Sequence, residues 1–501
     1  MKQRLLLQNQ YKLATPPVAR RERGDAARNF MDRILRARVA GPGLVIIALP
    51  APCGYPESLL DCFPHTFGVL WHSPHGPVVA GVEIAQSLAL EGADRFERLK
   101  AWSRVVAAGI TMHGCAPGPW PPPRFFGGFS FSPRADQGAP WRPFGDGLFV
   151  IPRWTYIRER ERAFLMLAMR APEIRLASKR RSVLMEYDMI IATLRADNSP
   201  VKIVRPPSPL PEVLAETIEQ MPPEEWQRYV DGIRDGIRAG KVRKVVAARR
   251  TVFQLTQSYR NTDILSRLAW EDPGSTRFAF RRDGTTFLGI TPETLFRKSG
   301  LSFCTHALAG TARVVEADDA VDTDQAERLL CNGKDRLEHS LVVQDIVERL
   351  APLCSTVCSA NVPQLRRVRN LWHLETPISG TLLETVSTAE LLAALHPTPA
   401  VGGVPREAAI RYIEKREGCP RGWYTGGVGW FDLVGDAVFS VAIRCGLLAG
   451  ERAYVFAGAG IVESSDAHLE YLESALKQGP LLRALGLDSR GCKATPRDIC
   501  S

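Results

Sequence analysis

The chain has 501 residues, of which 45% are hydrophobic and 24% charged, and its formal net charge is +10. These proportions are those of an ordinary globular protein and exclude a largely disordered or fibrous chain. The length allows two or three domains of ordinary size or one unusually large domain. The longest apolar stretches, such as residues 43–50, are far shorter than the ~20 residues of a membrane-spanning helix, so no membrane association is expected.

The positive charge is concentrated at the start of the chain. Residues 1–40 contain ten lysines and arginines but only three acidic residues. Such stretches are usually solvated, and this one lacks the row of aromatic side chains on which nucleic-acid bases would stack. We therefore expect a basic N-terminal arm that is partly disordered, and no nucleic-acid partner. The field of the arm could still attract an anionic substrate.

Eleven cysteines are scattered along the chain without a C-x-x-C pair. Their odd number and spacing argue against a disulfide framework or a zinc site and favour reduced thiols in a cytoplasmic protein. The N-terminus has no apolar signal core, so secretion is not expected. Its first twenty residues contain no acid, which leaves an organelle transit peptide open.

Two proline-rich stretches, 117–123 and 206–211, mark surface connections, because neither can lie inside a helix or a central strand. The second precedes a predicted helix over 212–239. The expected organisation is a basic arm (1–40), one large domain (41–487) with a first half (41–205) and a motif-bearing half (213–487), and a C-terminal tail (488–501).

Strands in the second half are predicted from turn dipeptides between apolar runs. Two hairpins result: 278–281 with 286–290 around Asp283-Gly284, and 428–433 with 437–448 around Gly435-Asp436. Adjacent hairpins imply antiparallel sheet. Helices are predicted over 334–350 and 466–478, the second stopped by Gly479-Pro480. The fold class is therefore α+β.

Each of these two helices carries a pair of acids three residues apart, Asp335 with Glu338 and Glu470 with Glu473. Residues at this spacing lie on one helix face. Carboxylates that converge from two helices suit a hard cation such as Mg²⁺. The alternative is a pair of solvated faces, and Lys477, four residues after Glu473, has the spacing of an ordinary surface ion pair.

Two residues have the surroundings of a general base and a general acid. Lys244 begins an apolar strand, where burial could favour its neutral form; the alternative is an edge-strand lysine with its ammonium group in water. Glu293 follows Pro292 at the end of a strand, and enclosure would let its carboxyl donate a proton to a leaving hydroxyl. A surface glutamate is the alternative reading there.

Three further residues are candidate anion ligands. Strict alternation over 437–448 places Arg444 opposite the apolar face, where its guanidinium could bind a carboxylate or simply face solvent. Gly458 and Gly460 are predicted in a loop between a strand over 454–457 and a helix, with backbone N–H groups available to an anionic oxygen. The two glycines do not complete the G-x-G-x-x-G pattern of dinucleotide-binding sites, because Glu463 stands where the third glycine would be. A nucleotide cofactor is therefore not favoured.

These segments together resemble the chorismate-utilising enzymes, a family that includes anthranilate synthase component I, salicylate synthase and isochorismate synthase. The resemblance is strong over residues 241–487, where it rests on KVVAAR at 244–249, GITPETL at 289–295, LAGTAR at 308–313, KDRLEH at 334–339 and GAGIV from 458. Upstream, FGGFSF at 126–131 and FVIPR at 149–153 also look like this family. It implies one α+β domain of two large antiparallel sheets, flanked by helices around a deep cleft.

The segment LHPTPAVGGVP at 395–405 is similar to isochorismate synthases. That branch would convert chorismate to isochorismate with Mg²⁺, adding water at C2 and losing the C4 hydroxyl, in menaquinone, siderophore or salicylate biosynthesis. Two alternatives stay open: a salicylate synthase, which continues to salicylate and pyruvate, and a catalytically silent protein that binds a chorismate-like ligand. The expected oligomeric state is a monomer or weak homodimer.

The resemblance also implies a role for each site residue. Lys244 would activate the water and Glu293 would protonate the leaving hydroxyl. Magnesium would be held by Glu338 and Glu473, with Asp335 and Glu470 supporting through water. Chorismate would meet a further set of residues: Gly310, Thr311, His373, Tyr424, Arg444, Gly458, Gly460 and Lys477.

Three positions depart from the family pattern or vary within it. Ala467 stands where a proline is usual, which should loosen the start of the following helix. The segment ETPISG at 375–380 matches no branch closely and could reshape the pocket wall. Val401 is one of several apolar residues found at its position.

Overall fold

The computed structural model describes residues 22–37, 43–74, 76–115, 120–134, 137–197, 215–257, 259–314, 319–368 and 371–487. Most of the basic arm, the proline-rich stretch at 206–211 and the tail at 488–501 lie outside these ranges. Within the arm, residues 22–36 form helix α2. Its Ala27, Met31 and Leu35 are buried against the first half of the chain.

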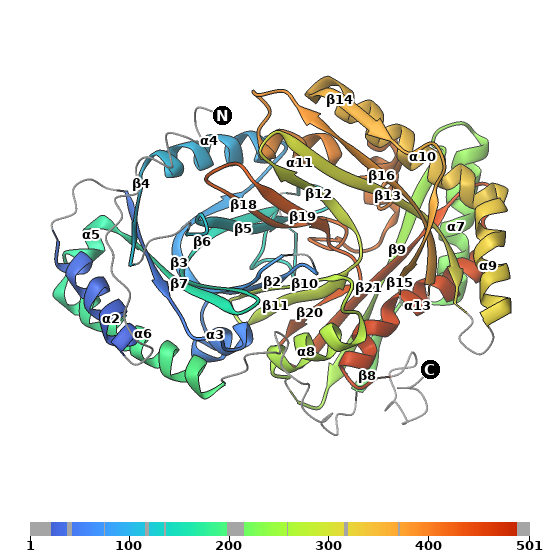
Figure 1. Ribbon diagram of the computed structural model, residues 1–501. Coiled ribbons are helices and arrows are strands. Elements are labelled where there is room, and N and C mark those ends of the chain that lie inside the picture. Colours follow the sequence, from blue (N-terminus) through green and yellow to red (C-terminus); the bar gives the residue numbers. More distant parts are fainter. Residues whose placement is uncertain are drawn as a thin grey trace.

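The helices surround the strands. In Figure 1, α2, α5 and α6 cover one end of the molecule, and α7, α9, α10 and α13 lie at the other. The helical elements are α2 (Glu22–Arg36), α3 (Pro56–Cys62), α4 (Arg95–Ala108), α5 (Ala171–Ile174), α6 (Ala177–Ala196), α7 (Pro223–Arg238), α8 (Asn261–Glu271), α9 (Asp319–Cys331), α10 (Gly333–Leu350), η1 (Ala351–Leu353), α11 (Thr388–Leu395), α12 (Arg406–Arg416) and α13 (Ala467–Ala484).

The first half of the chain contributes seven strands and the second half fourteen, counted over the described residues. The first seven are β1 (Leu44–Pro50), β2 (Gly68–His72), β3 (Val78–Leu90), β4 (Ile110–Gly114), β5 (Arg124–Phe129), β6 (Gly147–Glu159) and β7 (Arg162–Arg170). The others are β8 (Ala215–Gln220), β9 (Lys244–Leu255), β10 (Thr276–Arg282), β11 (Thr285–Thr291), β12 (Thr294–Ser299), β13 (Ser302–Arg313), β14 (Cys354–Ser359), β15 (Gln364–Val368), β16 (Leu371–Leu382), β17 (Gly403–Val404), β18 (Gly427–Asp432), β19 (Ala437–Val441), β20 (Cys445–Ala449) and β21 (Arg452–Ile461).

Hydrogen-bonded ladders join these strands into two layers. The first runs β4-β1-β7-β6-β3-β2-β10-β11-β20-β21-β9-β8, and the second runs β5-β18-β19-β12-β13-β16, with β14 and β15 on the far edge of β16. Strand β6 pairs with β7 in the first layer and with β5 in the second. The two predicted sheets are therefore parts of one continuous network. All pairs among the described strands are antiparallel except β1 with β4, which confirms the predicted α+β class.

The largest core cluster contains aromatic side chains from both layers. Trp71 and Phe278 belong to the first layer, and Phe126, Phe296 and Phe439 to the second; all five are at most 1% exposed. A second cluster packs the outer face of the first layer against α2, α3, α6, α8 and α13. Because the core spans both halves of the chain, the halves hold each other in place.

Both predicted hairpins are present. Asp283 and Gly284 have φ values of +49° and +72° and form the two-residue turn between β10 and β11. In the turn between β18 and β19, the Asp432 carboxylate accepts the N–H groups of Val434 and Asp436. These turns form where local residue preferences require them.

Three predicted boundaries were wrong. Residues 215–220 of the predicted helix form β8, and the helix begins only at α7, because Pro222-Pro223 interrupts it. The strand predicted over 437–448 breaks after β19 and resumes at β20. Helix α13 continues through Gly479-Pro480 to Ala484, since the burial of Leu481 and Leu482 favours another turn of helix.

No helix in the described ranges combines the length and the apolar character needed to cross a bilayer. The nine cysteines within these ranges are free thiols.

A buried ion pair couples the two halves of the chain. Arg277 on β10 lies 2.7 Å from Glu57 on α3, and both side chains are at most 1% exposed. Removing one partner leaves an uncompensated buried charge, at a cost of about 3–5 kcal/mol. We expect Arg277→Met to lower the free energy of unfolding by about this amount, measured by urea titration. The double variant Arg277→Met/Glu57→Leu should recover part of the loss; no recovery would show that the pair's charge is not the cause.

Candidate active site

A cavity of about 410 Å³ collects most of the predicted site residues. Its walls come from α10, α13, β13, β16, β21 and the connections that precede β12 and β20. Twelve of the fourteen predicted residues line it: Glu293, Gly310, Asp335, Glu338, His373, Tyr424, Arg444, Gly458, Gly460, Glu470, Glu473 and Lys477. Lys244 lies just behind the wall, and the Thr311 side chain is outside the described part of the structure.

Glu293 is buried between β11 and β12, which contradicts the surface alternative. Its N–H donates to Thr291 Oγ1 (3.2 Å), whose hydroxyl donates to the Val441 carbonyl (2.7 Å). The Glu293 carbonyl accepts the Val441 N–H at 3.0 Å. Burial raises the pKa of Glu293 to about 7, against the opposing effect of nearby cations, first among them Lys244. A carboxyl with this pKa can hold a proton near neutral pH and release it.

Lys244 is 1% exposed, and its Nζ lies 2.8 Å from Glu338 Oε1, so the solvent-exposed alternative is wrong. The pair lies against Gly460. A Cβ at Gly460 would come 2.3 Å from Glu338 Oε1 and 3.1 Å from Lys244 Cε. A glycine is therefore required for the carboxylate and the lysine to approach the backbone.

Gly458 and Gly460 belong to strand β21, not to the predicted loop. Strand β20 pairs with β21 only as far as Val455. Beyond that residue the same edge of β21 has no strand partner among the described residues, and Ala457, Gly458 and Gly460 line the cavity. Both glycines thus line the cavity, although from a strand edge and not from the predicted loop.

The break in the predicted strand orients Arg444. This residue has φ +50° and lies in the connection between β19 and β20, so strand alternation does not determine its direction. Arg444 lines the cavity, and burial lowers the pKa of its guanidinium to about 10. A group with that pKa is still cationic at neutral pH and suits an anionic ligand.

His373 and Tyr424 add neutral polar groups. Burial lowers the pKa of His373 to about 3, so the ring is neutral. Its Nδ1 lies 3.1 Å from the Gly310 carbonyl, which assigns the ring proton to Nδ1. Tyr424 stacks on Phe456 with ring centroids 5.1 Å apart, and burial raises the pKa of its hydroxyl.

Helices α10 and α13 both direct their acid pairs into this cavity. Glu338 is paired with Lys244 and Glu473 with Lys477, whose Nζ also donates to the Gly458 carbonyl at 3.1 Å. Four carboxylates are a donor set that suits Mg²⁺ chemically. Within the described ranges, however, no three Asp, Glu, His or Cys side chains come close enough to form a metal site. Glu338 and Glu473 are instead paired with lysine ammonium groups.

A family model described as "Chorismate binding enzyme" matches residues 40–486. The chain belongs to this family. A salicylate biosynthesis isochorismate synthase of Pseudomonas aeruginosa is 34% identical over 409 residues, 81% of this chain and 83% of the relative. The isochorismate synthase MenF of Bacillus subtilis is 34% identical over 370 residues, 74% of this chain and 76% of the relative.

Solved structures agree with this assignment. The menaquinone-specific isochorismate synthase MenF of Escherichia coli aligns with a TM-score of 0.73 and 25% identity, covering 92% of this chain and 99% of that chain. Anthranilate synthase component I of Streptococcus pneumoniae, at 21% identity and a TM-score of 0.61, shares the fold.

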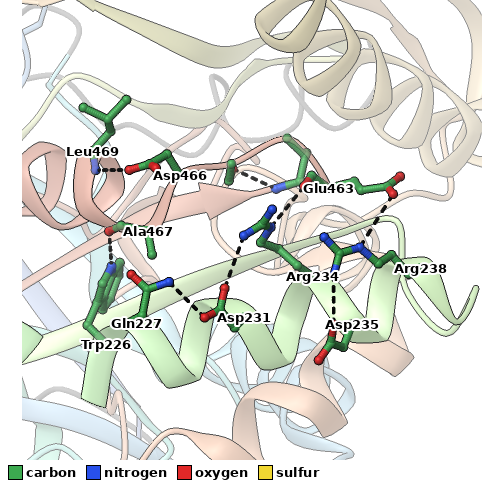
Figure 2. A network of polar contacts seen from close by, with 12 residues as sticks. Trp226, Gln227, Asp231, Arg234, Asp235, Arg238, Glu463, Asp466, Ala467 and Leu469 are labelled. Carbon is green, nitrogen blue, oxygen red and sulfur yellow. Dashed lines mark hydrogen bonds and ion pairs between the residues drawn. The ribbon is translucent and has the colours of Figure 1, made fainter. Parts of the chain in front are cut away.

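In this chorismate binding enzyme, helix α7 holds the turn that leads into α13 (Figure 2). Arg234 donates from Nε to the Glu463 carbonyl (3.2 Å), and the Trp226 indole donates to the Ala467 carbonyl (2.9 Å). Asp466 is the N-cap and accepts the Leu469 N–H at 2.9 Å. Ala467 therefore starts a helix that is capped by Asp466 and anchored by Trp226; the effect of an alanine at this position stays a prediction.

Sequence reasoning missed the residues that support the cavity wall of the enzyme. Arg421 is buried and donates to the carbonyls of Val246 (2.7 Å) and Val401 (2.8 Å), both cavity-lining residues. Glu417 pairs with Arg421 and accepts the Ala248 N–H at 3.0 Å. These contacts join three segments far apart in sequence, so no periodicity or spacing could have indicated them.

Proposed function

We propose that this protein is a magnesium-dependent isochorismate synthase that converts chorismate to isochorismate. The proposal rests on one arrangement. A buried, readily protonated glutamic acid, Glu293, lines a cavity together with Arg444 and Glu338, and the buried Lys244 is paired with Glu338 behind the cavity wall. The relatives named isochorismate synthases cover most of this chain.

The proposed reaction adds one water and releases another. Lys244 takes a proton from the water whose oxygen bonds to C2 of chorismate. The two ring double bonds each move by one position, and Glu293 gives its proton to the hydroxyl that leaves C4. Arg444 and Tyr424, with the β21 backbone around Gly458 and Gly460, bind the enolpyruvyl carboxylate. Water enters and leaves, so the net change is an isomerisation.

Glu338, Glu473, Asp335 and Glu470 would hold Mg²⁺, with Lys477 and Thr311 nearby. Bound Mg²⁺ would neutralise the ring carboxylate of the substrate. In the structure Glu338 is paired with Lys244, so the two proposed roles require that Glu338 turn from the lysine to the cation.

Chelation provides a direct test of metal dependence. We expect dialysis against EDTA to remove turnover of chorismate, and added Mg²⁺ to restore it. The treated protein should keep its circular dichroism spectrum, because the lysines balance two of the four acids when no metal is bound. Full activity in EDTA would contradict the magnesium assignment.

Product identification tests the function itself. The purified protein is incubated with chorismate and Mg²⁺, and products are separated by chromatography and identified by mass. We expect isochorismate as the product. Salicylate with pyruvate would indicate a salicylate synthase, and binding of chorismate without turnover would indicate a catalytically silent ligand-binding protein.

A further inference from the structure

We propose that His306, oriented by Glu375 and Arg366, is a positioning residue that fixes the backbone presenting Glu293 to the substrate. The inference rests on the proposed function, in which Glu293 is the proton donor. The proposal rests on one hydrogen bond: the Thr294 N–H, which belongs to the peptide that follows Glu293, donates to His306 Nε2 at 3.3 Å.

The imidazole occupies a place where the sheet itself provides no acceptor. Strands β12 and β13 pair from Arg297 with Cys304 to Ser299 with Ser302 and separate before Thr294. The ladder between β12 and β19 is also irregular between Thr294 and Phe296. Thr294 is paired with Ser440 of β19 on one side, but on the side of β13 the first residues of β12 depend on side chains. His306 accepts the Thr294 N–H, and Thr305 Oγ1 donates to the Leu295 carbonyl at 2.7 Å.

Three hydrogen bonds then fix the peptides on both sides of Glu293. Its N–H is bound by Thr291 and its carbonyl by Val441, both on the side of β11 and β19. The N–H of Thr294 is bound by His306 from β13. Without the third bond, the peptide that follows Glu293 would be held at its carbonyl by Val441 alone, and a tilt of this peptide would change the direction of the carboxyl.

The charge and tautomer of His306 suit this contact. An acceptor at Nε2 requires a neutral ring with its proton on Nδ1. Burial lowers the pKa of His306 to about 4, which keeps the ring neutral near pH 7. Nδ1 faces Glu375 Oε1 at 3.7 Å, and Arg366 Nη1 donates to the same oxygen. The carboxylate thus favours the Nδ1–H tautomer electrostatically.

This arrangement concerns the segment at 375–380, for which the resemblance led us to expect a reshaped pocket wall. Glu375 is its first residue and lies on β16 opposite Leu308 of β13 and Gln364 of β15. Its side chain faces His306 and Arg366. None of residues 375–380 is among the residues that line the cavity, so in this proposal Glu375 acts through His306 and not on the cavity surface.

Three variants, two at His306 and one at the adjacent Thr305, distinguish a positioning role of His306 from a contribution to packing alone. His306→Leu removes the acceptor, and His306→Gln keeps one, because a glutamine amide oxygen can take the place of Nε2. Thr305→Val is the matched control. It removes the hydrogen bond from Thr305 on β13 to the Leu295 carbonyl on β12, which is one residue farther from Glu293 than the contact of His306. Each variant is assayed for kcat and KM with chorismate and for thermal midpoint.

We expect His306→Leu to lower kcat by about 10- to 100-fold, as small displacements of catalytic groups do, with KM for chorismate changed by less than about twofold. His306→Gln should recover most of the loss, and Thr305→Val should lower the thermal midpoint while leaving kcat near wild type. Equal kcat values for His306→Leu and Thr305→Val would overturn the positioning role. Absence of turnover by the wild type would instead overturn the proposed function, and the inference with it.

Discussion

Replacing Glu293 by glutamine is expected to lower kcat for chorismate isomerisation by about 10²- to 10⁴-fold, the usual contribution of a general acid. The variant keeps the size of the side chain but has no proton to give. Wild-type kcat should fall as the pH rises through about 7, because burial raises the pKa of Glu293 to that value and only the protonated form can act. Steady-state kinetics between pH 5.5 and pH 9 would measure both effects.

The same pKa makes a separate prediction for stability. Its value in the folded protein, about 7, is above the ordinary value of 4.5. The folded state therefore holds a proton that the unfolded state has lost, and stability falls as the pH rises through this window. Glu293→Gln removes this dependence, so its thermal midpoint should exceed that of the wild type at pH 8. Exposed Glu384 provides the control Glu384→Gln, which should change neither property; an unaltered pH profile in Glu293→Gln would exclude the acid role.

Lys244→Ala is expected to lower kcat by a similar factor of about 10²–10⁴, because the water loses its base. Chorismate binding in the presence of Mg²⁺ should be largely retained, since the proposed carboxylate ligands are elsewhere in the cavity. The structure adds a second expectation. Lys244 places a positive charge 2.8 Å from Glu338, so its removal should make Mg²⁺ bind more tightly.

Isothermal titration with Mg²⁺ and equilibrium binding of chorismate would measure these properties independently of turnover. Lys241→Ala is the matched control, because Lys241 is an exposed lysine three residues earlier in the chain. Turnover of Lys244→Ala at the wild-type rate would rule out the base assignment. Unchanged or weaker Mg²⁺ affinity would show that Lys244 and the cation do not compete for Glu338.

The sequence by itself determined the features that depend on neighbouring residues. The hairpin at Asp283-Gly284 was predictable because the turn needs positive φ at both positions, which these residues tolerate. Helix α10 was predictable from its periodicity, and the three-residue spacing of Asp335 and Glu338 placed both acids on one face, here the cavity face. The resemblance to the chorismate-utilising enzymes then indicated which residues of distant segments the fold brings together.

The tertiary structure decided what depends on contacts between distant segments. Arg444 faces the cavity because the chain leaves the strand before it, at a positive φ that alternation does not predict. Helix α13 passes Pro480 because burial of the following leucines outweighs the lost hydrogen bond. Lys244 was assigned as a base and Glu338 as a metal ligand separately, and only packing against Gly460 shows that they form one ion pair. Burial, charge pairing and side-chain acceptors such as His306 arise only when the strands are assembled, and in our proposal they set the protonation and direction of the catalytic groups.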